Sequence, residues 1–261
     1  MTAAAPVAPA NVPVLEVRNL SKSFGGVQAV ADVSFTVGAG ELIALIGPNG
    51  AGKSTCFNML NGQLHPDQGQ VRLAGQNLAG LGPARIWRLG VGRTFQITAT
   101  FHSMTVRENV QMALLSHHRR LTSIWSRPAR EQLVEPANAL LDQVGMLEQA
   151  ERAASILAYG DLKRLELAVA LANEPRLLLM DEPTAGMGPR ERIDLMALTA
   201  DIARARSIAV LFTEHDMDVV FGHADRVLVL DRGVLIAQGR PDAVRADPTV
   251  QQVYLGSRAE A

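Results

Sequence analysis

A glycine-rich run at residues 47–55, Gly-Pro-Asn-Gly-Ala-Gly-Lys-Ser-Thr, constrains the fold of this chain more than any other segment. It follows the apolar stretch 42–46 and fits the pattern G-x-x-x-x-G-K-[ST], in which a strand leads through a glycine loop into a helix. Glycine lets the main chain approach an anion without a clash from Cβ, and the helix directs the positive end of its dipole at that anion. The run therefore predicts a phosphate-binding loop, or P-loop. A chance glycine turn before a helix is the alternative.

Backbone N–H groups of such a loop would cradle phosphates. Lys53 would reach the β- and γ-phosphates, and the Ser54 hydroxyl would bind Mg²⁺. The residues of the run expected to bind a nucleotide are Gly47, Pro48, Asn49, Gly50, Ala51, Gly52, Lys53, Ser54 and Thr55.

Composition sets limits on what else the chain can do. The 261 residues are 48% hydrophobic, enough for a sizeable core, and the formal net charge of −1 gives no reason to expect nucleic acid as a partner. The single cysteine, Cys56, cannot form an internal disulfide, which fits a reducing cytosol, and we expect it in the core. No window approaches the roughly 18 apolar residues of a membrane-spanning helix, so any membrane role must come through a partner.

Hydrophobic periodicity predicts an α/β domain over residues 14–256, between a flexible tail at 1–13 and a second tail at 257–261. Strands are expected first, at 14–20, 27–37, 41–46 and 70–73, with one helix at 55–60. A helical subdomain is expected at about 83–173, with helices at 84–89, 105–115, 131–144 and 161–171. Thr105 and Glu108 form a capping-box pattern at the start of the second of these. Strands at 177–180 and 208–212 enclose a helix at 190–204. A hairpin around Asp231-Arg-Gly233 leads into a C-terminal extension at about 233–256.

Two carboxylates, Asp181 and Glu182, follow the apolar strand expected at 177–180. Ligands of parallel α/β sheets bind at the carboxyl ends of the strands. Asp181 could therefore hold Mg²⁺ through its water shell, and Glu182 could orient or deprotonate a water that attacks the γ-phosphate. The alternative is that the pair only ends a strand before the turn at Pro183.

Four further features surround this constellation. His215 follows the strand at 208–212 and could reach the γ-phosphate, although a lone histidine is more often structural. Gln96 lies between the strand-rich part and the helices, where it could touch Mg²⁺ or water. Phe24 could stack on adenine or be an ordinary core residue. Leu157-Ala-Tyr-Gly160 opens a helix and forms another candidate anion site, far in sequence from the P-loop.

With these motifs in this order, the chain resembles the ATP-binding subunit of an ABC transporter over about residues 14–256. The resemblance implies a P-loop NTPase core with an antiparallel β subdomain and an inserted helical subdomain, and ATP and Mg²⁺ as cofactors. Two such subunits, identical or different, would stack head to tail. Each ATP would then lie between one P-loop and the partner's signature motif, here Leu157, Ala158, Tyr159 and Gly160.

The same resemblance makes Glu182, His215 and Gln96 the catalytic residues, with Ser54, Gln96 and Asp181 around the metal. It also implies integral membrane permease subunits, docked near residues 83–120, and indirectly an extracytoplasmic solute-binding protein. The chain would sit at the cytoplasmic face of the inner membrane.

Within this superfamily the chain is most similar to the ATPases of branched-chain amino acid importers. The similarity lies in residues 92–96, 104–109, 214–219 and 254–256. Urea-importer and lipopolysaccharide-export ATPases look similar too, and a non-transport ABC ATPase and a regulatory subunit that hardly hydrolyses ATP are further alternatives. Ala158 and Gly188 depart from the common pattern of the superfamily, which has serine and aspartate there, so we expect weaker or less coupled hydrolysis.

Overall fold

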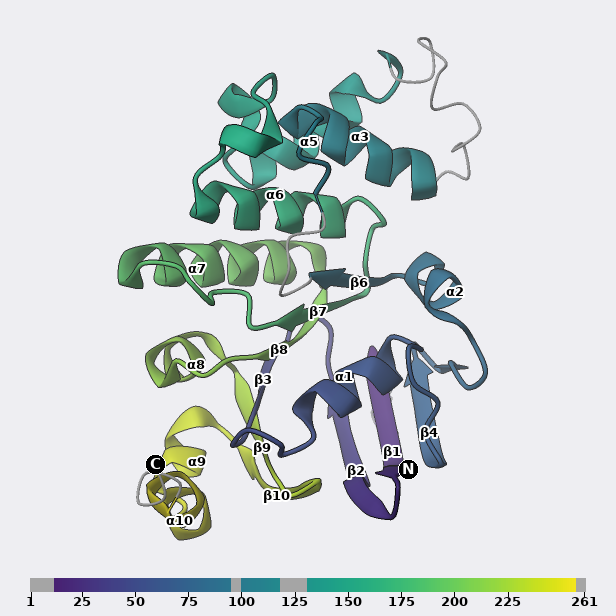
Figure 1. Ribbon diagram of the computed structural model, residues 1–261, viewed down its shortest axis with the longest axis vertical. Helices are drawn as coiled ribbons and strands as arrows, with labels where there is room; N and C mark the ends of the chain where they lie inside the picture. Colours follow the sequence, from purple (N-terminus) through teal and green to yellow (C-terminus); the bar gives the residue numbers. More distant parts are fainter. Residues whose placement is uncertain (1–11, 95–99, 118–130, 257–261) are drawn as a thin grey trace, which may run out of the picture.

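Two β-sheets organise the part of the chain that the computed structural model describes, residues 12–94, 100–117 and 131–256 (Figure 1). The first sheet is antiparallel and has four strands in the order β2-β1-β4-β5. Its strands are β1 (Leu15–Phe24), β2 (Val27–Val37), β4 (Gln68–Leu73) and β5 (Gln76–Asn77).

The second sheet has six strands in the order β10-β9-β3-β8-β7-β6. All neighbours are parallel except the final hairpin of β9 and β10. Its strands are β3 (Leu42–Ile46), β6 (Val91–Thr94), β7 (Leu177–Asp181), β8 (Ala209–Thr213), β9 (Arg226–Asp231) and β10 (Val234–Gly239). The hairpin turns through Arg232 and Gly233, both at positive φ, as a two-residue turn of this hand requires.

Strand β3 shows how the core is divided, because all five of its residues are buried. Successive side chains of a strand point to opposite faces, and a central parallel strand is covered on both. Ile43 and Leu45 pack with helix α1 (Lys53–Leu60) and the antiparallel sheet. Leu42, Ala44 and Ile46 belong to a second core on the other face.

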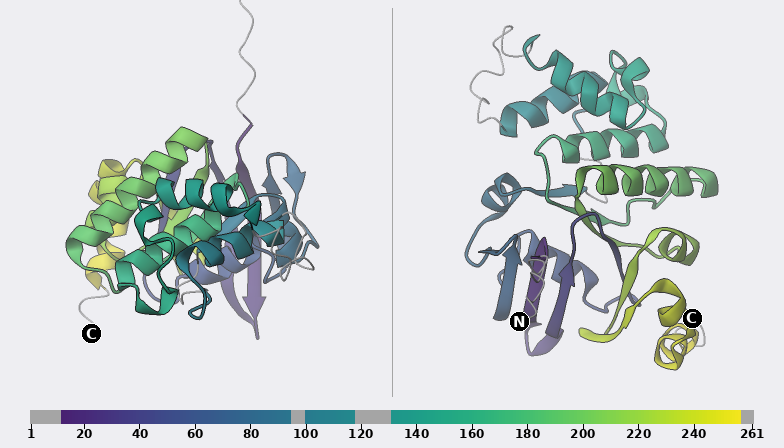
Figure 2. Two further views of the ribbon diagram at one scale, coloured as in Figure 1. Left: turned by 90° about the horizontal axis from the view of Figure 1, so that it is seen from above. Right: turned by 180° about the vertical axis from the view of Figure 1, so that it is seen from behind.

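Helices fill that second core and form the upper layers of the molecule (Figures 1 and 2). Helix α7 (Pro189–Arg206) lies nearest the sheet, α6 (Tyr159–Leu171) lies above it, and α3 (Val106–His117) and α5 (Val134–Gln143) cover α6. The remaining described helices are α2 (Pro83–Arg88), α8 (Met217–His223), α9 (Pro241–Ala246) and α10 (Pro248–Gly256), with short 3-10 turns η2 (Leu147–Gln149) and η3 (Ala154–Ile156).

Helix α3 begins with the capping box that the sequence predicts. The Thr105 N–H donates to the Glu108 carboxylate at 2.9 Å, and the Glu108 N–H donates to the Thr105 hydroxyl at 3.2 Å. Cys56 is buried, as expected.

The structure adds a strand that the sequence did not predict within the helical subdomain expected at about 83–173, because β6 lies in the six-stranded sheet beside β7. Its four residues are too short a run to show a strand pattern, and its pairing with β7 comes from a segment more than eighty residues later in the chain. Gly92 allows this placement, since a Cβ there would lie 2.9 Å from the carbonyl oxygen of Ala170 in α6. Helix α2 precedes β6 in the chain, and α3, α5 and α6 follow it. The bounds of the inserted subdomain stay a prediction.

None of the described helices combines the length and the hydrophobicity needed to cross a bilayer.

Candidate nucleotide site

The P-loop joins β3 to α1 and is shaped by glycines that no other residue could replace without strain. Gly47 has φ 154° and Gly52 has φ 101°. A Cβ on Gly47 would lie 2.2 Å from the carbonyl oxygen of Leu230, and one on Gly52 would lie 2.3 Å from that of Ala29. The loop is thus held against the end of β9 on one side and β2 on the other.

The start of α1 is suited to an anion. Gly52 occupies the N-cap position, and no side chain there accepts a hydrogen bond from the first turn. The first N–H groups of a helix need acceptors, and a phosphate placed there would supply them. Ser54 is exposed at the same end of the helix and Thr55 is half-buried.

Lys53 folds back over the loop. Its Nζ donates to the carbonyl oxygens of Gly47 at 2.7 Å and Pro48 at 3.1 Å, and only 8% of the residue is exposed. Burial lowers the pKa of the Lys53 ammonium, while the charges of Glu182 and Asp181 act in the opposite direction. The cation therefore lies within the electrostatic influence of both predicted carboxylates.

Asp181 ends β7 and contacts Thr213 and Arg93. One carboxylate oxygen accepts the Thr213 hydroxyl at 2.8 Å, and the other lies 3.5 Å from the Arg93 guanidinium. Arg93 also donates to the side chains of Asn58 and Gln63, both at 3.1 Å. These contacts fix the carboxylate at the carboxyl end of the sheet. A hydroxyl such as Ser54 and a carboxylate such as Asp181 are the hard oxygen donors that Mg²⁺ prefers.

Glu182 and His215 come together although they lie 33 residues apart. His215 Nε2 is 2.8 Å from Glu182 Oε1. The register of the two strands explains this, because Asp181 in β7 pairs with Thr213 in β8. Side chains just beyond this pair must then meet at the same edge of the sheet.

The backbone of Glu182 is strained. Its φ is 47°, in the left-handed region that residues with a side chain rarely adopt. The Glu182 N–H donates to both the hydroxyl and the carbonyl of Thr213, at 3.0 and 3.2 Å, and these bonds hold the conformation. Such strain concentrates at functional sites, where it fixes a side chain in place.

Phe24 ends β1 with 46% of its surface exposed, so the alternative of an ordinary core phenylalanine is wrong. The Lys22 ammonium lies 5.6 Å from the centroid of its ring. An exposed ring of this kind is free to stack on a base, and its role with adenine stays a prediction. Gln96 lies outside the described residues.

The motif at 157–160 begins α6. Ala158 is the N-cap residue, Gly160 is buried in the first turn, and the Tyr159 ring is 41% exposed. Helix α7 lies between α6 and the P-loop helix α1, both in the front view (Figure 1) and in the view from behind (Figure 2). Leu157, Ala158, Tyr159 and Gly160 are therefore not brought to the P-loop of their own chain.

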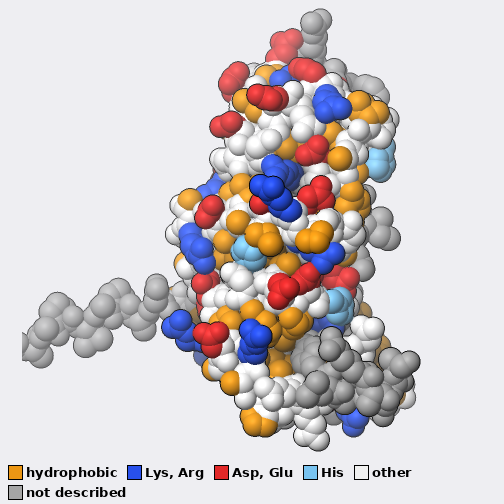
Figure 3. Space-filling model, turned by 90° about the vertical axis from the view of Figure 1, so that its left-hand side faces the viewer, with side chains coloured by type: hydrophobic (Ala, Val, Ile, Leu, Met, Phe, Trp, Pro, Cys, Tyr) orange, Lys and Arg blue, Asp and Glu red, His pale blue; other side chains and the backbone are white. Residues whose placement is uncertain are grey.

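Figure 3 views the side of the molecule on which α6 and α7 begin and the parallel strands end. Charged, histidine and hydrophobic side chains are mixed over this face. Tyr159 and Ile193, the latter in the first turns of α7, are among the exposed large hydrophobic residues of the chain, at 41% and 53%.

Sequence reasoning missed four polar residues that organise this edge, namely Arg93, Arg192, Thr213 and Glu214. Glu214 is 4% exposed and accepts both the N–H and the hydroxyl of Thr184, at 2.9 and 2.6 Å. Its place beside His215 in the sequence was the only available signal, because its partner Thr184 lies in the loop after β7, 30 residues earlier in the chain.

The β-sheet order, the glycine loop and the acidic edge together define a P-loop ATPase. Known sequences place it more closely. The profile of the ABC transporter family matches residues 30–185, and that of the branched-chain amino acid ATP-binding cassette transporter matches residues 234–260. The chain belongs to the ABC transporter family and is an ATP-binding cassette ATPase.

Individual relatives agree with this assignment. The chain is 40% identical over 252 residues to the high-affinity branched-chain amino acid transport ATP-binding protein LivG of Escherichia coli K12, which covers 94% of this chain and 98% of the relative. It is also 40% identical over 253 residues to BraF of Pseudomonas aeruginosa, with the same coverage.

Solved structures show the same fold. The crystal structure of an ATP-binding cassette of an ABC transporter in its ADP conformation has 32% identity and a TM-score of 0.83, over 94% of this chain and 99% of that one. A nucleotide-free cassette has 31% identity and a TM-score of 0.82, over 93% and 98%. The family and the fold class predicted from the sequence are confirmed.

Proposed function

We propose that this chain is the ATP-hydrolysing subunit that energises a membrane importer for branched-chain or related amino acids. The observation that carries the catalytic part is the 2.8 Å contact between Glu182 and His215 at the sheet edge that also holds Asp181. The solute is supported by relatives that are named as branched-chain amino acid transport proteins, and by the C-terminal match at 234–260.

In this proposal the P-loop binds the phosphates of ATP. Lys53 leaves the carbonyls of Gly47 and Pro48 for the β- and γ-phosphates, because a phosphate oxygen is a stronger partner for an ammonium than a neutral carbonyl. Mg²⁺ would be held by Ser54, by Asp181 through water and by Gln96, and would neutralise charge on the β- and γ-phosphates.

Glu182 acts as the base that orients or deprotonates the attacking water, and His215 contacts the γ-phosphate. The histidine ring is half exposed and within hydrogen-bonding distance of the base, so both groups can face one reacting centre. The strained backbone of Glu182 and its bonds to Thr213 hold the carboxylate there.

The site is completed by a second cassette, identical or different. The motif Leu157–Gly160 begins a helix on the far side of α7 from the P-loop, which favours a role toward the partner's ATP. The N–H groups of Gly160 and its neighbours would bind the γ-phosphate across the contact. Ala158 lacks the hydroxyl of the usual serine, so the backbone carries this contact alone.

Permease subunits would dock between α2, α3 and α6, at the cytoplasmic face of the membrane. A pocket of about 270 Å³ opens there, lined by Trp87, Phe101, Asn109, Met112, Ala113, Ser116 and Val169. It has the mixed apolar and amide lining that suits the end of an amphipathic helix. An extracytoplasmic binding protein would supply the solute to the permease. A urea importer and a lipopolysaccharide-export ATPase are the alternative assemblies.

The variant Glu182→Gln tests the shared site. Removing the base stops hydrolysis but leaves the phosphate contacts, so ATP should convert the variant from monomer to a stable dimer in size-exclusion chromatography with light scattering. Glu135→Gln, an exposed change in α5, is the matched control and should behave as wild type. A Glu182→Gln variant that stays monomeric with ATP while transport is intact would rule out the shared site.

Uptake by cells tests the solute. A strain without this chain should lose ATP-dependent import of radiolabelled leucine and keep that of urea, and Lys53→Ala should fail to restore it. Loss of urea import with intact leucine import would favour the urea assembly instead.

A further inference from the structure

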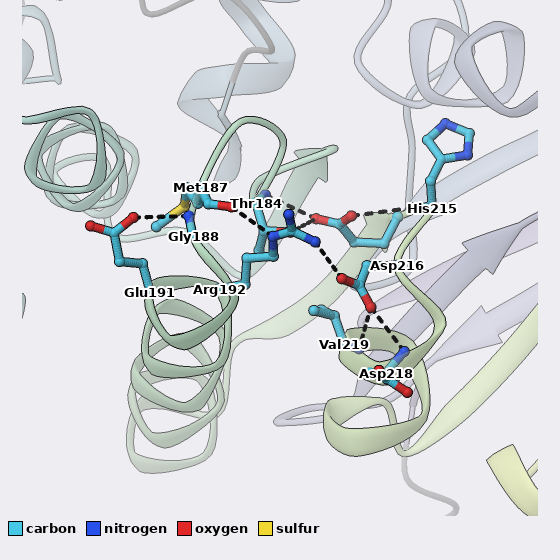
Figure 4. A network of polar contacts seen from close by, with 10 residues as sticks. Thr184, Met187, Gly188, Glu191, Arg192, His215, Asp216, Asp218 and Val219 are labelled. Carbon is cyan, nitrogen blue, oxygen red and sulfur yellow. Dashed lines mark hydrogen bonds and ion pairs between the residues drawn. The ribbon is translucent and has the colours of Figure 1, made fainter.

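Two segments meet at the catalytic edge, and every residue of the shorter segment contacts a residue of the longer one. The segment 213–216 follows β8, and the segment 181–192 runs from the end of β7 into α7. Thr213 bonds Asp181, Glu214 bonds Thr184, His215 contacts Glu182, and Asp216 bonds Arg192. Figure 4 shows the outer part of this network, from Glu191 and Arg192 to His215 and Asp216. His215 is thus fixed on both sides along its own segment.

The last of these contacts, that of Arg192, connects helix α7 with the loop at Met187 and with Asp216. Its Nε donates to the carbonyl oxygen of Met187 at 2.8 Å, and its Nη1 donates to Asp216 Oδ2 at 2.5 Å. The side chains of Arg192 and Asp216 are 31% and 27% exposed, so water screens the pair less than it would a pair on the open surface. The planar guanidinium fixes both bonds in one geometry, which lysine could not do.

Asp216 divides its carboxylate between two tasks. Oδ1 accepts the N–H groups of Asp218 and Val219 at 3.0 and 3.4 Å and so caps α8, while Oδ2 takes the arginine. Burial alone would raise the pKa of Asp216, but the bonds from Arg192, Val219 and Asp218 lower it overall, so the carboxylate is charged at neutral pH. The residue directly after His215 is therefore bound both to its own helix and to α7.

The loop at 186–188 has no polar side chain of its own that could make this connection. Gly186 and Gly188 flank Met187, and Gly188 is bound through its N–H to Glu191 at 3.0 Å. The Tyr159 ring lies against Gly186, where a Cβ would be 3.3 Å from the ring. A displacement of this loop thus reaches the histidine segment through Arg192.

We propose that Arg192 is a positioning residue for ATP hydrolysis, which ties the loop before α7 to the segment that carries His215 and so keeps His215 on Glu182. This inference rests on the proposed function, because it takes His215 as part of the catalytic site. Arg192 donates to the Met187 carbonyl and to the Asp216 carboxylate, so it acts on His215 through these two residues.

Steady-state ATPase assays, nucleotide binding and thermal unfolding of four variants test this. Arg192→Ala should lower kcat about tenfold and leave the Kd for ATP within about twofold, because the P-loop is untouched. Asp216→Asn should do the same, since asparagine keeps the cap of α8 but loses the charge for Arg192. The double variant should be no slower than either single variant. Arg190→Ala, an exposed change two residues before Arg192, should match wild type.

A His215→Ala background separates positioning from a general loss of stability. Measured by single-turnover hydrolysis, Arg192→Ala should have no further effect there. The inference is overturned if Arg192→Ala keeps the wild-type kcat, if only the Kd changes, or if it slows the His215→Ala variant by the same factor as wild type. If His215→Ala is itself as active as wild type, the proposed role of His215 fails first, and the inference with it.

Discussion

Gly47 offers the most direct test of the P-loop geometry. In Gly47→Ala the new Cβ would stand 2.2 Å from the Leu230 carbonyl oxygen, whereas an ordinary contact begins at 3.4 Å. A backbone carbonyl cannot rotate away, so the end of β9 and the loop must separate. Overpacking of this kind costs about 1–3 kcal/mol, and the unusual φ of 154° adds about 1–3 kcal/mol.

A matched substitution isolates the steric part. Gly75, in the turn between β4 and β5, has φ 82° and no atom within 4 Å of a Cβ. Gly75→Ala therefore carries only backbone strain, about 1–2 kcal/mol. For a chain of this size each 1 kcal/mol lowers Tm by about 2–4 °C.

Thermal unfolding and titration with a fluorescent ADP analogue measure both effects. Gly47→Ala should lower Tm at least twice as far as Gly75→Ala and bind the nucleotide at least about tenfold more weakly, since a tenfold loss needs only about 1.4 kcal/mol. Gly75→Ala should bind like wild type. If Gly47→Ala binds the nucleotide as tightly as wild type and has the same Tm as Gly75→Ala, the close approach of β9 to the loop does not shape the site.

Three more results are expected. Lys53→Ala should lose nucleotide binding in the same titration, because the Lys53 ammonium is the cation that binds the loop carbonyls of Gly47 and Pro48; tight binding by this variant would place the site elsewhere. Burial raises the pKa of Cys56 to about 12 from 9.0, so iodoacetamide at pH 8 should alkylate the native protein at least about a thousandfold more slowly than the urea-unfolded chain, and equal rates would contradict the burial. Ala158→Ser should raise the ATPase rate about two- to tenfold by adding one hydrogen bond, whereas the exposed change Ala139→Ser should not; an unchanged rate in Ala158→Ser would remove the reason to expect weak hydrolysis.

Local patterns account for what could be predicted. The P-loop, the capping box of Thr105 and Glu108, and the hairpin at Arg232–Gly233 each depend on residues a few positions apart, and the structure contains all three. Glu182 and His215 could be predicted individually because each follows an apolar strand. That they meet depends on the pairing of β7 with β8, which brings Asp181 beside Thr213.

What was missed depends on contacts between distant segments. Strand β6 has no apolar alternation of its own and is a strand because β7 lies beside it. Arg93 and Arg192 look like ordinary surface cations in the sequence. Their partners Asp181 and Asp216 become neighbours only in the folded chain. Nothing in a one-dimensional pattern distinguishes these arginines from the others.

The left-handed backbone at Glu182 has a consequence for how this cassette can be improved. Glycine or asparagine in place of Glu182 would relax that conformation. A screen for heat resistance alone should therefore enrich such replacements, and these would abolish ATP hydrolysis. Thermal stability and catalytic turnover make opposite demands on this one residue, so any search for more stable variants has to keep Glu182 unchanged.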